Sequence, residues 1–230
     1  MIMSDIHNCI ECKIGSNCFN KLVLAELEFI NEKKTQIAYR KGENLCKQGA
    51  YASYVLYVAS GLVKLYIENT NNKFTNFKIL KAGEFIGFAS VFGENIYNYS
   101  AVAIKDAQIC LIEKEGIRNL IESNSAFASE IIKGYSKDEN IIIERLKSVS
   151  YKQMNGRIAD VILYLSSEKF NNEDLYKYIT RKDIADFACI SNESTVKILA
   201  EFKNENIIEL EGKNIKILDL EKLKSISRHG

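Results

Sequence analysis

The residues of this sequence that are best suited to chemistry are its cysteines. Three of the six, Cys9, Cys12 and Cys18, form a C-x2-C-x5-C cluster near the N-terminus. The first twenty residues hold cysteines and charged side chains rather than an apolar signal segment, and no run is apolar enough to span a membrane. We therefore expect a cytoplasmic protein whose thiols stay reduced. In that setting cysteines are metal ligands or small buried residues rather than disulfides.

Histidine-based catalysis is not expected in this chain, because its only histidines are His7 and His229, both near the termini. A dinucleotide-binding glycine fingerprint is absent from the sequence too, so we expect a protein that is not an enzyme. Hydrophobic residues make up 47% of the chain and its net charge is +1, which excludes a disordered chain and a strongly basic one. A length of 230 residues suits two domains, each with its own core.

One stretch, residues 125–150, predicts a single long helix, because it lacks proline and repeats apolar residues three and four positions apart. At ~1.5 Å per residue it would span roughly 37 Å, which is too long for the interior of one small domain. We expect a two-fold coiled-coil seam between two copies, with a plain core helix as the alternative. The expected seam consists of Ile132, Tyr135, Glu139, Ile142, Leu146 and Val149. Glu139, its polar residue, would set the register of the seam or weaken it.

The segment before this helix has the pattern of a β-roll or β-barrel. Between residues 35 and 113, short apolar runs such as residues 54–58 and 62–67 alternate with turns that contain glycine. Helices are expected on either side, over residues 19–33 and 114–123.

The C-terminal third predicts a winged helix-turn-helix. Thr180 followed three residues later by Asp183 is typical of a capped helix start, and a tight turn leads to a second helix over residues 192–205. Residues 207–210 and 215–218 have the pattern of a two-stranded wing, and the second helix would enter a DNA major groove. A helical hairpin with no special role is the alternative. Residues 151–230 carry 13 basic and 13 acidic side chains, so a DNA-binding face depends on local placement of cations. The candidate cations are Arg181, Lys182, Lys197, Lys213 and Lys216.

A β-roll, a long helix and a winged helix-turn-helix, in that order, resemble the Crp/Fnr family of bacterial transcription regulators. The motifs that carry the resemblance are GEFIG at residues 83–87, TRKDI at 180–184 and SNESTVK at 191–197. The resemblance implies an α+β homodimer with an N-terminal cyclic-nucleotide-binding-like roll, which binds double-stranded DNA and contacts RNA polymerase. The domains would be a cysteine-rich segment (1–20), the sensor roll (21–124), the dimerisation helix (125–150) and the DNA-binding domain (151–230).

The resemblance also implies which residues meet DNA. They are Thr180, Arg181, Ser191, Asn192, Glu193, Ser194 and Lys197. Residues just after the turn read base edges in this family, and Glu193 suits the amino group of cytosine. Lys197 stands where the family usually has arginine, so it keeps the charge and loses the bidentate fork.

Family members that bind cyclic nucleotides have Gly-Glu and Arg-Ser-Ala around the phosphate. Here the corresponding stretches are Gly87-Phe88 and Tyr99-Ser100-Ala101, which lack the glutamate for the ribose and the arginine for the phosphate. Because a buried phosphate without a counter-ion is costly, we expect no cyclic nucleotide to bind.

The cysteines match the Fnr branch of the family instead. Its oxygen sensors hold a [4Fe–4S] cluster with an N-terminal C-x2-C-x5-C set and one cysteine late in the roll, which implies Cys9, Cys12, Cys18 and Cys110 as ligands here. The implied function is a regulator that senses oxygen, redox state or nitric oxide through a cluster that controls dimerisation. The alternatives are a regulator with zinc or no metal, gated by another ligand, and a redox or electron-transfer protein. Cys46 and Cys189 fit no ligand pattern and are expected to be small buried residues.

Overall fold

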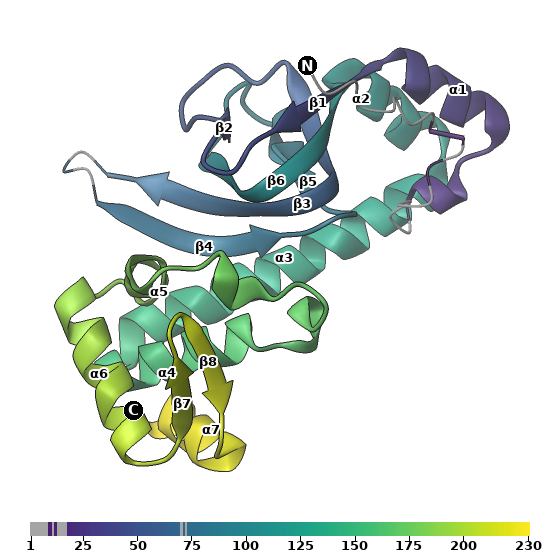
Figure 1. Cartoon of the computed structure of the whole chain (residues 1–230). Coiled ribbons are helices and arrows are strands. Elements are labelled where there is room, and N and C mark those ends of the chain that lie inside the picture. The colour runs from purple at the N-terminus through teal and green to yellow at the C-terminus, as the bar shows by residue number, and fades with distance from the viewer. Residues whose placement is uncertain (1–8, 11, 13–17, 70, 72) are drawn as a thin grey trace. The chain divides into compact units, whose positions relative to one another are not determined.

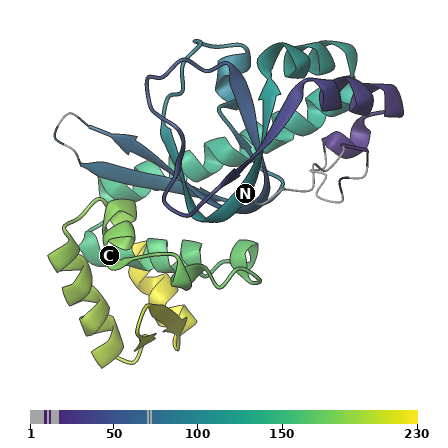
Figure 2. The ribbon, with the colours of Figure 1, turned by 45° about the horizontal axis from the view of Figure 1, so that its top comes forward.

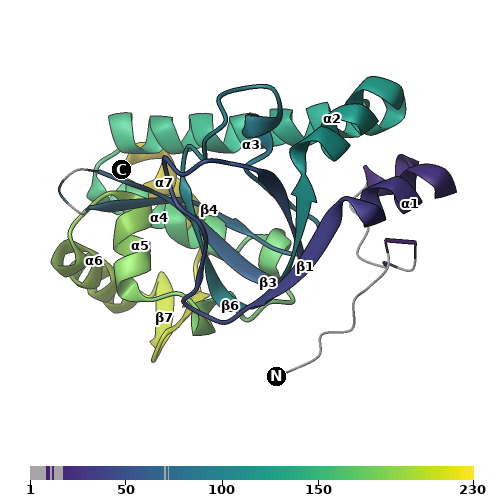
Figure 3. The ribbon, with the colours of Figure 1, turned by 90° about the horizontal axis from the view of Figure 1, so that it is seen from above.

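Two compact units make up the structure, which is a computed structural model. It describes residues 9, 10, 12, 18–69, 71 and 73–230. The first unit comprises Met1–Lys73 and Lys78–Glu139, and the second comprises Phe74–Phe77 and Asn140–Gly230. Helix α3 (Ser125–Tyr151) belongs partly to each unit, and Figure 3 shows it as one uninterrupted helix. Most of the predicted cysteine-rich segment, residues 1–20, lies outside the described residues.

A six-stranded sheet, all of it in the first unit except Phe74–Phe77, dominates that unit (Figure 1). Its strands are β1 (Lys34–Tyr39), β2 (Asn44–Cys46), β3 (Tyr54–Glu68), β4 (Phe74–Leu80), β5 (Phe85–Ile86) and β6 (Ser100–Glu113). The strand order is β1-β6-β3-β4, with β2 also paired to β6 and β5 to β3. The two apolar runs predicted at 54–58 and 62–67 are a single strand, because Gly61 adopts φ +90° and the register shifts around it.

Short helices close one end of the roll. A 3-10 turn (Phe19–Lys21) precedes α1 (Leu24–Glu32), and α2 (Lys114–Ser123) follows β6 and contacts α1. Another 3-10 turn (Phe88–Val91) follows β5. The core at this end comes from both the sheet and these helices. Its buried members include Ile30, Tyr57, Ile112, Ile117, Leu120 and Phe127. Each such side chain contributes roughly 1.5–3 kcal/mol by leaving water.

The second unit is mainly helical (Figure 2). It contains α4 (Met154–Leu165), two 3-10 turns (Glu168–Phe170 and Leu175–Lys177), α5 (Arg181–Ala188), α6 (Asn192–Asn204), the antiparallel hairpin β7 (Ile208–Glu211) and β8 (Asn214–Ile217), and α7 (Leu220–His229). The predicted helix-turn-helix and wing are therefore present. Helix α7 was not predicted, although Asp219 caps it by accepting a hydrogen bond from the Lys222 amide at 2.8 Å.

Within the part of the chain that the structure describes, no helix is both long and apolar enough to cross a membrane.

Candidate functional site

The first helix of the helix-turn-helix begins at a capping box. The Thr180 hydroxyl accepts a hydrogen bond from the Asp183 amide at 3.0 Å, and the Asp183 carboxylate accepts from the Thr180 amide at 2.8 Å. Two amides that lack helical partners are thereby satisfied, which fixes where α5 starts. Asp183 is itself buried, so its side chain serves this cap and does not face solvent. Thr180 is an exposed cap residue at the same point.

The turn between α5 and α6 differs from the prediction at Cys189. Cys189 was expected to be buried, and it is exposed. It ends α5 in the left-handed conformation, with φ 54°, so the chain leaves the helix there and turns the side chain toward solvent. Cys46 is buried as expected. Ser191 then caps α6 by accepting from the Ser194 amide at 3.0 Å.

Helix α6 divides cleanly into a buried face and an exposed face. Its buried residues are Thr195, Ile198, Leu199 and Phe202. Asn192, Glu193 and Lys197 are exposed, and Glu193 and Lys197 lie one turn apart on the same side of the helix. Neither side chain makes a hydrogen bond or ion pair to the rest of the described chain, so both are available to a ligand. Of the predicted DNA-contacting residues in α6, Ser194 is half-buried, and its hydroxyl accepts a hydrogen bond from the Ser191 hydroxyl at 3.0 Å.

Arg181 makes contacts that the sequence did not indicate. Its guanidinium donates to the carbonyl of Gly212 at 3.0 Å and to that of Lys213 at 3.4 Å, in the turn of the wing. Burial lowers the pKa of this guanidinium, although it remains a cation. Arg181 therefore ties the start of α5 to the wing, which leaves Lys213 and Lys216 as the exposed cations of the hairpin.

The predicted seam of α3 is largely unpaired in the single chain. Ile132, Ile142 and Leu146 are 65%, 54% and 62% exposed, and Glu139 is exposed between them. Tyr135 is 46% exposed because its ring packs edge-on against Phe88. Val149 is half-buried. The stripe repeats every seven residues, which is the spacing of a coiled-coil seam.

The residues of the two stretches that differ from cyclic-nucleotide-binding members, Phe88 and Tyr99-Ser100, contact other residues of the first unit. The Phe88 ring stands between those of Phe85 and Tyr135, with centroid distances of 5.5 and 5.8 Å. The Tyr99 hydroxyl accepts a hydrogen bond from the Gly87 amide at 2.9 Å, and burial raises the pKa of this phenol. The Ser100 hydroxyl donates a hydrogen bond to the Glu68 carboxylate at 2.9 Å, so this hydroxyl is already paired with a protein carboxylate.

Three of the four predicted ligand cysteines belong to, or pack against, the apolar cluster at the end of the roll where the short helices lie. Cys18 and Cys110 are buried in the same apolar cluster, and Cys9 packs against it. Burial raises the pKa of the Cys110 thiol to about 11, and the same cause raises the pKa of Cys9. Lys34 opposes both shifts, whereas Cys9 and Cys12 reinforce that of Cys110. Cys9, Cys12 and Cys110 are thus close enough to act electrostatically on one another.

The donor set at this end suits a thiolate-ligated group. Thiolates are the ligands of iron–sulfur clusters, and the Lys34 ammonium is a cation placed to offset their charge. Lys34 was not predicted from the sequence, because its position beside the thiols depends on the pairing of β1 with β6. In the described residues, no group of three or more histidine, cysteine, aspartate or glutamate side chains is already arranged as a metal shell.

Two parts of the chain match known protein families. Residues 36–124 match the cyclic nucleotide-binding domain, and residues 156–226 match the Crp-like helix-turn-helix domain. The chain belongs to the Crp/Fnr family. It is a transcription regulator of the Crp/Fnr type and binds DNA. The predicted α+β architecture is confirmed as well.

This Crp/Fnr regulator is similar to named regulators over most of its length. It is 25% identical over 230 residues to electron transport regulator A of Shewanella oneidensis, covering 96% of this chain and 90% of that protein. The same identity and coverage hold for the fumarate and nitrate reduction regulatory protein of Vibrio cholerae. The structure of FixK2 from Bradyrhizobium japonicum shares its fold, with a TM-score of 0.75, 18% identity and coverage of 84% of this chain and 96% of that one.

Proposed function

We propose that this regulator senses oxygen, redox state or nitric oxide through a [4Fe–4S] cluster held by Cys9, Cys12, Cys18 and Cys110. The observation that supports the proposal is that Cys18 and Cys110 share one apolar cluster against which Cys9 packs, while Cys12 and Lys34 act electrostatically on Cys9 and Cys110. Relatives named as an electron transport regulator and as fumarate and nitrate reduction regulators support the same function. A cluster of this kind supplies a group that oxygen or nitric oxide destroys.

The protein around these cysteines would control whether the cluster assembles. Ligation requires thiolates, and burial of Cys9 and Cys110 favours the neutral thiols. Lys34 works in the opposite direction, because a cation stabilises a nearby thiolate. Zinc bound by the same thiolates is the second candidate, since four sulfur ligands also suit a tetrahedral zinc site.

The apolar cluster offers a route from the cysteines to helix α3. Cys18 and Cys110 share that cluster with Phe127, which is fully buried, and with Ile131, both of which belong to α3. Assembly of a cluster there would change what the first turns of α3 pack against. We infer that this change strengthens pairing of α3 with its copy in a homodimer. The homodimer would present two α6 helices to DNA and would contact RNA polymerase.

The seam itself is suited to a weak dimer, whose equilibrium with the monomer a bound group could shift. Ile132, Ile142 and Leu146 provide the attraction, while Glu139 would approach its own copy across the two-fold axis. Two carboxylates close together repel each other or force one to take a proton. The free energy supplied by cluster assembly then decides between monomer and dimer.

The metal is tested by an anaerobic absorption spectrum of freshly purified protein. We expect a broad band near the boundary of visible and ultraviolet light that bleaches in air. Cys12→Ser and Cys110→Ser should lose the band, and Cys189→Ser is the matched control because that thiol is exposed and outside the set. A colourless preparation containing zinc would replace the cluster by the second candidate, and one without metal would refute both.

Control of assembly is tested by analytical ultracentrifugation with and without oxygen. Glu139→Leu should give a dimer that persists in air without the cluster. Cys12→Ser and Cys110→Ser should leave a largely monomeric protein even without oxygen. Tight dimers of the cysteine variants that bind DNA normally would show that the thiols do not govern assembly.

The same proposal excludes a cyclic nucleotide as the signal. Phe88 packs against Phe85, the Tyr99 hydroxyl accepts from the Gly87 amide, and neither side chain offers a cation to a phosphate. Titration calorimetry with cyclic AMP and cyclic GMP should give no heat of binding at physiological concentrations, and micromolar affinity for either would contradict the proposal.

A further inference from the structure

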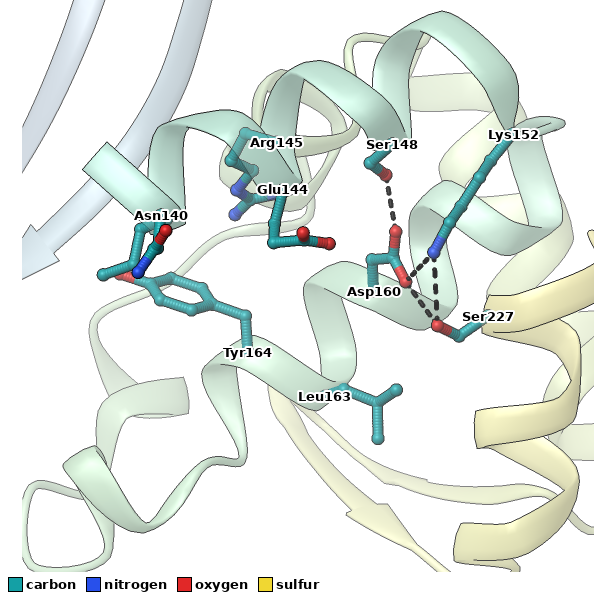
Figure 4. Close-up of a pocket in the computed structure, with 10 residues that line it drawn as sticks. Asn140, Glu144, Arg145, Ser148, Lys152, Asp160, Leu163, Tyr164 and Ser227 are labelled. Carbon is teal, nitrogen blue, oxygen red and sulfur yellow. Dashed lines mark hydrogen bonds and ion pairs between the residues drawn. The ribbon is translucent and has the colours of Figure 1, made fainter. Parts of the chain in front are cut away.

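A cluster of paired polar side chains holds three helices of the second unit together. The Asp160 carboxylate in α4 accepts hydrogen bonds from Ser148 in α3 at 2.6 Å and from Ser227 in α7 at 2.5 Å, and it also accepts from Lys152 at 2.8 Å, as the dashed lines in Figure 4 mark. These bonds leave the carboxylate little capacity for a ligand. What the second unit offers to DNA is therefore sought among the exposed side chains of its helix-turn-helix.

The exposed face of α6 carries one large apolar side chain, that of Val196, which is 49% exposed. Each of the other large hydrophobic side chains of this helix is at most 4% exposed, namely those of Ile198, Leu199 and Phe202. Val196 follows Glu193 by three residues and directly precedes Lys197, so these three side chains fall within an arc of about 100° around the helix axis. An apolar group thus lies beside the two predicted base-contacting residues.

The position of Val196 distinguishes it from an ordinary exposed hydrophobic residue. Single apolar side chains on a protein surface are common and need no explanation of their own. On α6, however, a β-branched residue is a weaker helix former than alanine, and no burial in the core compensates for this. Valine has one strongly preferred rotamer in a helix, so Val196 can present its methyl groups to a ligand with little further loss of side-chain freedom.

We propose that Val196 determines specificity by contacting the C5-methyl group of a thymine in the major groove. This methyl is the one apolar group on the major-groove edges of the four bases, which otherwise present hydrogen-bond donors and acceptors. Valine pairs with neither, so any other base placed against it would lose water from a polar group without gaining a partner. The half-site of this regulator should therefore contain a thymine that Val196 selects, in addition to the bases that meet Glu193 and Lys197.

This inference concerns the DNA sequence that is read and not the signal that is sensed. It depends on α6 entering the major groove and does not involve the cysteines, so it holds whichever group they bind. The proposed homodimer presents α6 twice, which places one such thymine in each half-site of the operator.

The test begins with selection of duplexes from a randomised pool by the anaerobically purified full chain. Each thymine of the selected half-site is then replaced in turn by deoxyuracil, which removes the methyl group and keeps the base pair. Fluorescence anisotropy should reveal one position at which affinity falls roughly fourfold, and about tenfold when both half-sites are changed, as expected for one or two methyl groups no longer buried.

The Val196→Ser variant links this loss to one side chain. Serine and valine have similar helix propensities, so α6 should remain folded. We expect the variant to bind the thymine and deoxyuracil duplexes equally. Leu220→Ser is the matched control, because it removes another exposed apolar side chain, 44% exposed and located in α7, and should keep the full preference for thymine.

The measurements on the wild type need no variant, so the proposal can fail even if Val196→Ser does not fold. It is overturned if the pool is not enriched in any sequence, if the selected half-site contains no thymine, or if every deoxyuracil duplex binds the wild type as tightly as its parent. A deoxyuracil penalty of unchanged size in Val196→Ser would assign the methyl contact to another residue and overturn it as well.

Discussion

Replacing Glu193 and Lys197 separately by alanine tests how helix α6 reads DNA. Both side chains are exposed and one turn apart, and neither supports the core of the unit, which rests on Ile198 and Leu199. Alanine is the best helix former, so α6 should remain folded in each variant. The loss of Glu193 from the first turn costs the helix only about 0.3–1 kcal/mol of favourable dipole interaction.

The expected loss in affinity follows from the number of contacts. A base contact contributes about 1–3 kcal/mol of discrimination, and a dimer presents α6 twice, so each variant should lose about 2–6 kcal/mol on its specific duplex. At about 1.4 kcal/mol per tenfold, the smaller figure already corresponds to roughly 30-fold.

The assay is fluorescence anisotropy on a specific and a scrambled duplex over a series of salt concentrations. A base-reading residue loses affinity on the specific duplex and relaxes preference at one base position. Equal loss on both duplexes, with a salt slope smaller by about one per lost phosphate contact, would refute the reasoning for Lys197. Lys203→Ala is the matched control, because this exposed lysine lies about 9 Å further along the same helix, in its last turn.

Three further substitutions test the stability of the fold. Gly61→Val should destabilise the first unit by about 3 kcal/mol in urea unfolding, because φ is +90° and a side chain would overlap the backbone of β6. Lys78→Met removes the buried cation that pairs with Asp138 at 2.5 Å and Glu84 at 3.3 Å, and should cost about 2 kcal/mol; an unchanged urea midpoint would mean that water already compensates these carboxylates. Thr180→Ala should cost about 1 kcal/mol and weaken DNA binding, and a variant as stable as the wild type would argue against the capping box.

The elements that were predicted correctly are those whose signals are local. The capping box at Thr180, the seven-residue repeat of α3 and the wing around Gly212 each depend on residues a few positions apart, which pattern and turn chemistry can reveal. The break predicted within β3 was wrong because a glycine at positive φ can be absorbed as a bulge when a partner strand continues on either side.

The features that sequence reasoning missed depend on contacts between distant segments. Arg181 meets the wing carbonyls some thirty residues later in the chain, and Lys34 reaches the thiols only because β1 pairs with β6. Arg145 is another such residue, because its guanidinium lies over the rings of Tyr164 in α4 and Phe187 in α5. A signal was present for α7, namely Asp219 ahead of Leu220, Leu223 and Ile226 at helical spacing.

The uninterrupted course of α3 restricts how the length of this chain can change. The boundary between the two units falls after Glu139, in the middle of the helix, where a flexible linker would otherwise tolerate insertions. One residue inserted there would turn every later side chain by about 100° about the helix axis and move Ile142 and Leu146 out of line with Ile132. Seven residues would restore the phase and lengthen the helix by about 10 Å. Insertions or deletions in α3 should therefore occur in steps of seven residues, because only these keep the exposed apolar residues on one side of the helix.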